Sequence, residues 1–242
     1  MFLGLAFSLP FITFIKYQKQ KSNKTMRKSI HLFLAMTAFL LCSCTSQPTN
    51  TANAETTAAD SATTENIVTE TILARRSIRQ YKAQPVEKEK MDEIIKCGVY
   101  APNGMGRESW EVRVVDDAAL LAEIDSCNSA MLAKTNPDKA KMKAAYGAPV
   151  LVFIAYDTRY DLSQVDCGLL GGNMMIAAQS LGLGSCCLGS ICRLLNAPEG
   201  SDLLKRLNFP ETHKLLYAIA FGYPDEAPKA KPRHMEKVQY IK

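Results

Sequence analysis

Three guanidinium groups and one hydroxyl lie within the five residues Arg75-Arg76-Ser77-Ile78-Arg79. A guanidinium group donates paired hydrogen bonds to a phosphate or carboxylate, and a serine hydroxyl adds one more donor. The stretch therefore predicts a seat for a phosphate group. The alternative is that the charges form an ordinary solvated surface.

Cysteines are the second group of residues that could carry chemistry. Two of the eight lie in the N-terminal segment, and six lie downstream: Cys97, Cys127, Cys167, Cys186, Cys187 and Cys192. Zinc and iron–sulfur sites use paired cysteines at C-x-x-C spacing, and these six do not follow it. We therefore expect no metal site and small buried thiols. A disulfide is the alternative if the chain is exported.

The three histidines do not suggest a catalytic group. His31 lies in the N-terminal segment, and His213 and His234 lie near the ends of a predicted strand and a loop. A lone histidine is more often structural than catalytic, so we read these three as structural.

The net charge of +5 is concentrated at the N-terminus. Residues 1–44 contain six of the 29 Lys and Arg residues and none of the 24 Asp and Glu residues. The remaining chain is nearly neutral, which argues against nucleic acid as a partner.

The N-terminal segment has the order of an export signal. A basic start, Met26-Arg27-Lys28, precedes an apolar run at 30–41 that is too short to span a bilayer comfortably. The run ends in the box Leu41-Cys42-Ser43-Cys44, which resembles a bacterial lipoprotein signal. That resemblance implies a lipid on Cys44 and a membrane-anchored protein that faces the periplasm or the cell surface. An ordinary secretory signal or an uncleaved anchor is the alternative.

The boundaries of this segment follow from composition. Residues 1–44 form the predicted signal segment. A second apolar run at 1–15 suggests that translation starts at Met26, with a long n-region or a short anchor as the alternative. Residues 45–64 are rich in Thr, Ala, Ser and Asn and have too little apolar surface to fold, so we interpret them as a flexible tether.

Residues 65–242 are predicted to form one α+β domain. Helices are predicted at 65–75 with Thr64 as cap, 85–100, 116–135 and 161–181, with short helical pieces in 188–209. Strands are predicted at 110–115, 148–156, 215–221 and 238–241. The order lacks the regular βαβ alternation of a doubly wound sheet.

The helix at 161–181 has a face of small residues. Its small residues are Gly168, Gly171, Gly172, Ala177 and Ala178. Glycine costs about 1 kcal/mol in a helix interior relative to alanine, so close approach of another helix is expected here. That neighbour could belong to the same core or to a second subunit.

The order R-R-S-[IV]-R-x-[FY] after an amphipathic helix resembles the opening motif of the nitroreductase family of FMN-dependent oxidoreductases. Three further segments resemble the family in the same order: 101–110, 166–184, and Gly222-Tyr223-Pro224 with Lys231-Pro232-Arg233. The resemblance covers about residues 65–242. It implies a central, mostly antiparallel sheet flanked by helices, in an intertwined homodimer with FMN at the interface.

The resemblance also assigns roles to particular residues. Arg75, Arg76 and Ser77 would hold the FMN phosphate, and Lys231 and Arg233 would close the same end of the cofactor. Arg79 would lie near the pyrimidine edge of the flavin, where a cation favours negative charge on N1 of the reduced ring.

Two further segments would contact the flavin. Cys187-Leu188-Gly189-Ser190 matches the stretch along the flavin ring, with Leu188 and Gly189 close to N5; a plain loop is the alternative. The loop Pro102, Asn103, Gly104 to Gly106 would come from the other subunit.

The loop departs from the family pattern. Gly106, Glu108 and Ser109 stand where the family has Asn, Gln and Pro. Glu108 adds an anion near a site that prefers cations, unless it points away or pairs with Arg107.

The implied activity is hydride transfer from NADH or NADPH, through flavin N5, to a small acceptor such as a nitroaromatic or a quinone. No protein acid, base or nucleophile is required, because the flavin carries the chemistry. A flavin-binding lipoprotein with little turnover and a thiol redox lipoprotein are the alternative hypotheses.

Overall fold

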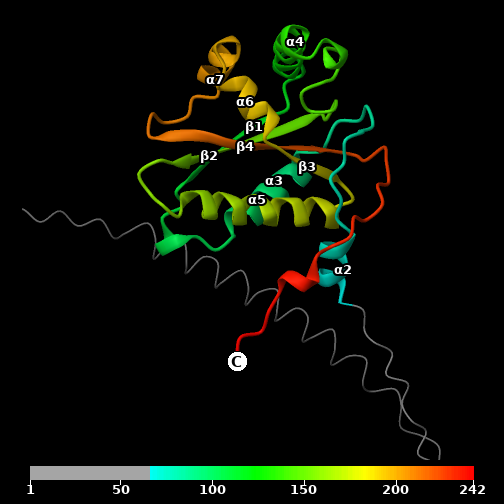
Figure 1. Ribbon diagram of the computed structural model, residues 1–242, viewed down its shortest axis with the longest axis vertical. Helices are drawn as coiled ribbons and strands as arrows, with labels where there is room; N and C mark the ends of the chain where they lie inside the picture. The colour runs from blue at the N-terminus through cyan, green and yellow to red at the C-terminus, as the bar shows by residue number, and fades with distance from the viewer. Residues whose placement is uncertain (1–65) are drawn as a thin grey trace, which may run out of the picture. The chain divides into compact units, whose positions relative to one another are not determined.

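The computed structural model describes residues 66–242 (Figure 1). The predicted signal segment, the start at Met26, lipidation at Cys44 and the tether at 45–64 lie outside the described residues. Within 66–242, no helix is both long enough and apolar enough to cross a membrane.

Four strands form an antiparallel sheet in the order β1-β2-β4-β3. They are β1 Trp110–Val115, β2 Val150–Asp157, β3 Gly184–Leu188 and β4 His213–Gly222. The predicted α+β class with an antiparallel sheet is therefore confirmed.

The central strand β2 is apolar and buried from Val150 to Ala155 because both of its faces are covered there. Val152 and Ile154 face one apolar cluster, and Leu151 and Phe153 face the other; all four are fully buried. A strand at the centre of a two-sided core has no solvent-facing positions, which explains the unbroken apolar run.

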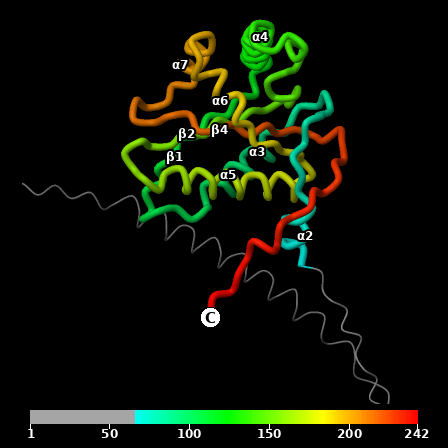
Figure 2. Tube along the Cα trace, in the orientation of Figure 1, coloured from blue at the N-terminus to red at the C-terminus, as the bar shows by residue number. Residues whose placement is uncertain are grey.

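Helices cover both faces of the sheet (Figure 1). On one face lie α3 Lys88–Val99 and α5 Ser163–Ser180. On the other lie α4 Ala118–Thr135, α6 Ser190–Leu195 and α7 Ser201–Arg206. The first described helix, α2 Ile67–Ala74, lies beside α5, and the trace in Figure 2 shows the C-terminal segment leaving the domain on the same side.

Two predictions about elements were wrong, and one strand was not predicted. The cap of α2 is Asn66, whose side chain accepts from the backbone N–H groups of Val68 and Thr69, and not Thr64. No strand was predicted at Gly184–Leu188, where the structure has β3. Residues 238–241 form no strand, because no other strand of the described chain pairs with them.

The glycines of α5 divide between the two predicted roles. A methyl group on Gly171 would lie 2.1 Å from the hydroxyl oxygen of Tyr217, so glycine there allows packing within the chain. A methyl group on Gly168 or Gly172 would meet nothing within 4 Å in the described residues. These two positions leave room for a neighbour from outside the chain.

Candidate functional site

The basic stretch lies along the edge of β3. Ile78 donates its N–H to the carbonyl oxygen of Ser185 at 3.0 Å, and Ser77 and Ser185 form an isolated bridge. The approach is close: a methyl group on Gly184 would lie 2.7 Å from Cγ1 of Ile78. Glycine at 184 therefore lets the stretch lie against the sheet.

A second contact ties the end of the stretch to the segment after β4. Lys82 donates its N–H to the Tyr223 carbonyl oxygen, and Asp225 donates to the Gln80 carbonyl oxygen, each at 2.9 Å. The carboxylate of Glu226 accepts from the N–H of Arg79. The basic stretch is thus held on both sides.

The three guanidinium groups have different surroundings. Nη1 of Arg75 is buried and has no hydrogen-bond partner among the described residues. Nη1 of Arg76 donates to the carbonyl oxygens of Leu73 at 2.6 Å and Arg75 at 2.9 Å, at the end of α2. Nη1 of Arg79 makes a 3.3 Å bond to the Ser77 carbonyl oxygen.

Two unpaired donors make the seat suitable for an external anion. Besides Arg75 Nη1, the hydroxyl of Ser185, a residue that is 1 % exposed, is buried without a partner in the described chain. A buried polar group without a partner costs about 1–3 kcal/mol. A phosphate, with several acceptor oxygens, would satisfy such donors.

Thiols lie next to the seat. Burial raises the pKa of Cys186 above its ordinary value, while Arg79, the Ser77 hydroxyl and Arg75 act in the opposite direction. All six described cysteines are free. The expectation of buried thiols is wrong for Cys187, which is exposed and directly precedes Leu188.

The strand end at Leu188 and Gly189 is open on one side. Leu188 is buried in the apolar core. Gly189 precedes α6, and a methyl group placed on it would meet nothing within 4 Å in the described chain. The backbone at Gly189 therefore has room beside it for a ligand, and the predicted flavin contact of Leu188 and Gly189 stays a prediction.

The loop of Asn103 and Gly104 is fixed by a carboxylate that sequence reasoning missed. Asp166, 2 % exposed, accepts from the N–H of Gly104 at 2.8 Å and from the hydroxyl of Ser109 at 2.9 Å. The Asn103 side chain accepts from the N–H of Glu108 at 3.0 Å. Only the spatial neighbours of Asp166 reveal this role, because a single aspartate in a helix has no sequence signature.

The loop needs left-handed backbone at its tip. Gly106 has φ of +64° and Met105 has φ of +58°. Glycine and asparagine adopt this conformation most readily. Glycine at 106 therefore suits the backbone that the loop adopts here, and Pro102, which precedes the tip, is exposed.

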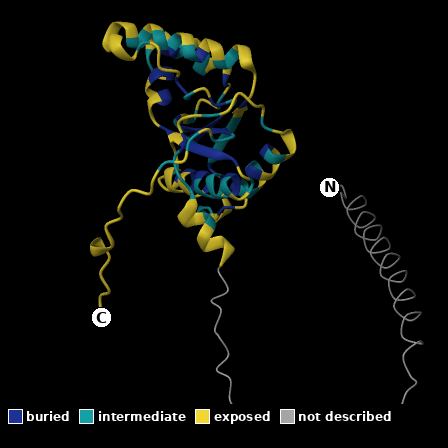
Figure 3. Ribbon diagram, turned by 90° about the vertical axis from the view of Figure 1, so that its right-hand side faces the viewer, coloured by how far each residue is buried: buried dark blue, intermediate teal, exposed yellow. Residues whose placement is uncertain are grey.

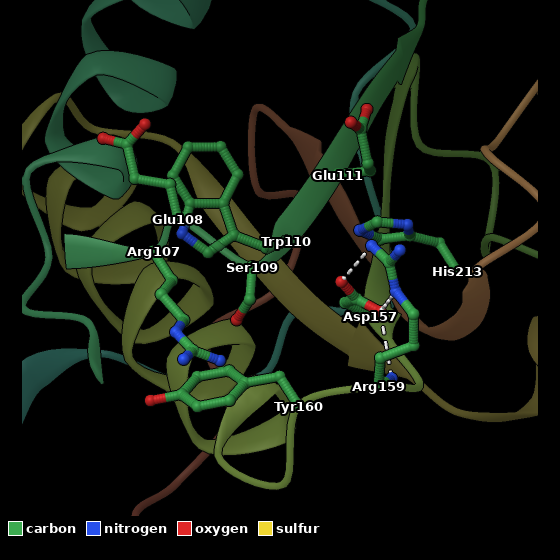
Figure 4. Close-up of a pocket in the computed structure, with 9 residues that line it drawn as sticks. All are labelled: Arg107, Glu108, Ser109, Trp110, Glu111, Asp157, Arg159, Tyr160 and His213. Atoms are coloured by element: carbon green, nitrogen blue, oxygen red, sulfur yellow. Dashed lines mark hydrogen bonds and ion pairs between the residues drawn. The ribbon is translucent and has the colours of Figure 1, made fainter. Parts of the chain in front are cut away.

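Arg107 and Glu108 do not pair. The Arg107 guanidinium lies 4.5 Å from the centre of the Tyr160 ring, and Figure 4 shows the Glu108 carboxylate pointing away from it. Both line a polar pocket of about 530 Å³ that also includes Asp157 and Arg159. Hydrogen bonds from Arg159 at 2.9 and 2.8 Å hold the pKa of Asp157 well below its ordinary value.

Within one chain, the loop and the basic stretch lie at opposite ends of α5. The loop is bonded to Asp166 near the start of the helix, and the basic stretch is bonded to Ser185, just after its end. At about 1.5 Å rise per residue, the helix from Asp166 to Ser180 spans about 21 Å. Figure 1 shows the segments before β1 and after α2 at opposite ends of α5. A single chain therefore does not bring the two predicted halves of the site together.

An apolar groove lies between α2, α3 and α5. Its volume is about 390 Å³, and it is lined by Ile67, Val68, Thr71, Cys97, Asn173, Ile176, Ala177 and Ser180. Two of the apolar side chains of α2 are largely exposed, Ile67 at 75 % and Val68 at 59 %. Exposed apolar surface of this kind is typical of an interaction face.

The predicted phosphate ligands near the C-terminus are not brought to the seat. Lys231 and Arg233 are exposed, and Arg233 donates to the carbonyl oxygens of Lys231 and Pro232 in its own segment. Figure 3 shows this exposed segment extending away from the domain. Their predicted role stays a prediction.

Comparison with known proteins decides the family. The profile described as "Nitroreductase family" matches residues 72–223, well over half of the chain. The chain belongs to the nitroreductase family. The predicted family, sheet and flanking helices are thereby confirmed.

Other members of the nitroreductase family are similar over most of this domain. The NADPH-flavin oxidoreductase of Vibrio harveyi is 32 % identical over 183 residues, which cover 69 % of this chain and 70 % of that protein. The nitroreductase structure with bound FMN from Bacteroides fragilis is 29 % identical with a TM-score of 0.66, covering 73 % of this chain and 100 % of its own. The corresponding structure with bound FMN from Desulfitobacterium hafniense is 26 % identical with a TM-score of 0.67, covering 73 % and 99 %.

Proposed function

We propose that this protein is an FMN-dependent oxidoreductase that takes electrons from NADH or NADPH. The observation that carries the proposal is the buried Nη1 of Arg75, which has no hydrogen-bond partner among the described residues. It belongs to the basic stretch, which a backbone hydrogen bond from Ile78 joins to Ser185. The names of the relatives support the cofactor and the donor: one is an NADPH-flavin oxidoreductase, and two solved relatives bind FMN.

The residues of the seat suit the parts of FMN. Arg75 and Ser77 would donate to the phosphate, and Arg79 would place positive charge beside the flavin. The backbone at Leu188 and Gly189 would face the ring, since Gly189 leaves open space. Bound FMN supplies the group that accepts and returns hydride. The role of these residues is therefore to bind the FMN, to orient its ring and to polarise it.

A homodimer completes the proposed site. In one chain the loop at Gly104 and the seat at Arg75 lie at opposite ends of α5, so a two-fold partner would bring one chain's loop to the other chain's seat. The apolar groove of α2, α3 and α5 supports this pairing, because a second copy would cover Ile67 and Val68. Gly168 and Gly172 would then allow close approach.

The acceptor is proposed to be a small planar molecule such as a nitroaromatic or a quinone. A planar acceptor can stack on the flavin face at the distance that hydride transfer needs. The protein is also proposed to be exported and anchored by a lipid on Cys44. Because NADH and NADPH are scarce outside the cytoplasm, the electron donor of an exported chain is to be measured directly.

The test is a spectrum followed by rapid kinetics. The full chain, purified in mild detergent and mixed with FMN, should show protein-bound flavin bands after gel filtration. Mixing with NADH or NADPH without oxygen should bleach these bands, and a nitroaromatic or quinone should restore them. A chain that retains flavin without bleaching by either donor contradicts the proposed activity.

The anchor is tested separately. Cells grown with a clickable fatty acid should label the wild-type chain and not the Cys44→Ala variant. Equal labelling of both contradicts lipidation at Cys44.

A further inference from the structure

Glu226 brings a carboxylate into a seat that otherwise carries three arginines. It follows β4 by a few residues, and its side chain accepts a hydrogen bond from the backbone N–H of Arg79. The neighbouring bonds Asp225 N–H to Gln80 and Lys82 N–H to Tyr223 are between backbone atoms. Glu226 is therefore the side chain that fixes this segment to Arg79.

The charge of Glu226 is felt by the other groups of the seat. Burial is the main cause of the raised pKa of both Tyr81 and Cys186, and the Glu226 carboxylate raises both further. Arg79 acts in the opposite direction on the same two groups. Glu226 and Arg79 thus have opposing electrostatic effects on one small region.

A carboxylate here has a predictable effect on an anionic ligand. FMN carries a phosphate dianion, and the flavin becomes more negative when it is reduced. A fixed negative charge in the seat therefore weakens the binding of both forms and disfavours the reduced form more strongly. The same carboxylate also holds the backbone of Arg79 in place.

Building on the proposed function, we propose that Glu226 is a positioning residue for Arg79 and an internal counter-anion that lowers the reduction potential of the bound flavin. Glu226 contacts the backbone of Arg79 and not the cofactor. Its effect on the flavin is electrostatic, through the negative charge that it adds to the seat. A seat with fewer negative charges would bind FMN more tightly and hold the reduced form too firmly for easy transfer to an acceptor.

Two substitutions separate the charge of Glu226 from its hydrogen bond. Glu226→Gln keeps an oxygen that can accept from Arg79 but removes the charge. Glu226→Ala removes both. Asp225→Asn is the matched control, because Asp225 is exposed and contacts Gln80 through its backbone N–H.

The experiment measures the FMN dissociation constant and the midpoint potential of the FMN-loaded full chain. For Glu226→Gln we expect FMN binding about three- to tenfold tighter and the ratio of reduced to oxidised affinity raised about tenfold, which is about 30 mV for two electrons. Asp225→Asn should shift the potential much less. Glu226→Ala should bind FMN more weakly than Glu226→Gln, because Arg79 loses its support.

The results distinguish a failure of the Glu226 proposal from a failure of the proposed FMN binding. If Glu226→Gln holds FMN at the wild-type potential, or shifts no more than Asp225→Asn, Glu226 has only a structural role and this inference is overturned. If the wild-type chain does not bind FMN at all, the proposed function itself fails.

Discussion

The backbone N–H of Ile78 donates a 3.0 Å hydrogen bond to the carbonyl oxygen of Ser185, and this bond joins the basic stretch to the edge of β3. It sets the predicted phosphate-binding arginines beside the predicted flavin-lining strand. Two segments about a hundred residues apart in sequence thereby form one seat. The space for this contact comes from Gly184.

Gly184→Ala should destabilise the domain and loosen FMN. The new methyl group would lie 2.7 Å from Cγ1 and 2.9 Å from Cβ of Ile78, which forces the basic stretch off the strand. Overpacking of this kind costs about 1–3 kcal/mol. Urea unfolding measures it. The double variant with Ile78→Ala should lose less than the sum of the single variants; strict additivity would show that the two residues do not collide.

Asp166→Asn should release the loop that carries Gly104. The carboxylate accepts two charge-assisted hydrogen bonds, whereas the neutral amide accepts more weakly and has one acceptor oxygen in place of two. We expect a loss of about 1–3 kcal/mol in the free energy of unfolding, together with weaker FMN binding. Exposed Asp161→Asn is the control. Equal effects of the two substitutions would contradict the role of Asp166.

The Arg159–Asp157 pair should make stability depend on pH in a defined direction. The pKa of Asp157 is lowered from 3.8, chiefly by hydrogen bonds from Arg159. A carboxyl group whose pKa is lower in the folded state adds stability above its unfolded pKa and loses it as pH falls through the folded value. The stability difference between wild type and Arg159→Gln should therefore be present at pH 7 and shrink below about pH 4. A difference that is constant down to pH 2 would refute this.

Val68→Asp should give a folded monomer with a weakened cofactor site. Val68 is 59 % exposed within the chain, so the substitution leaves the chain's own core intact but places charge in the apolar groove. Sedimentation should show half the wild-type mass. Met142→Glu, which is also exposed but lies in the segment after α4, is the control. If the Val68→Asp chain sediments as the wild type does, the groove is not part of the dimer interface.

Long apolar patterns allowed most of the fold to be predicted. The continuous run of β2 and the spacing in α4 follow directly from burial on one or two faces. The strand β3 was missed because Gly184, Ser185 and Cys186 are small residues without alternation, and their strand geometry depends on pairing with β4 and Ser77. The prediction of a strand at 238–241 was wrong for the opposite reason. The residue types Val238, Tyr240 and Ile241 favour strands, but no strand of the described chain pairs with them.

The candidate site was predictable where it is contiguous in sequence. Arg75, Ser77 and Arg79 lie within five residues, so their shared chemistry is evident. Asp166 and Glu226 act on residues far away in sequence, and only the fold reveals them. Nη1 of Arg76 contacts carbonyl oxygens at the end of α2, which the sequence does not reveal, and the predicted phosphate contact of Arg76 stays a prediction.

The most direct measurement is a titration of FMN into the full chain and into its Arg75→Gln variant. Quenching of the flavin fluorescence reports the binding. We expect equimolar binding to the wild type and an affinity about 10- to 100-fold weaker for Arg75→Gln, because a charge-assisted bond to phosphate contributes about 1.5–3 kcal/mol. Arg206→Gln, which removes a surface pair with Glu123 on the other side of the sheet, should bind as the wild type does. A wild-type chain that binds no FMN, or an Arg75→Gln chain that binds it with unchanged affinity, would contradict an FMN phosphate site at Arg75.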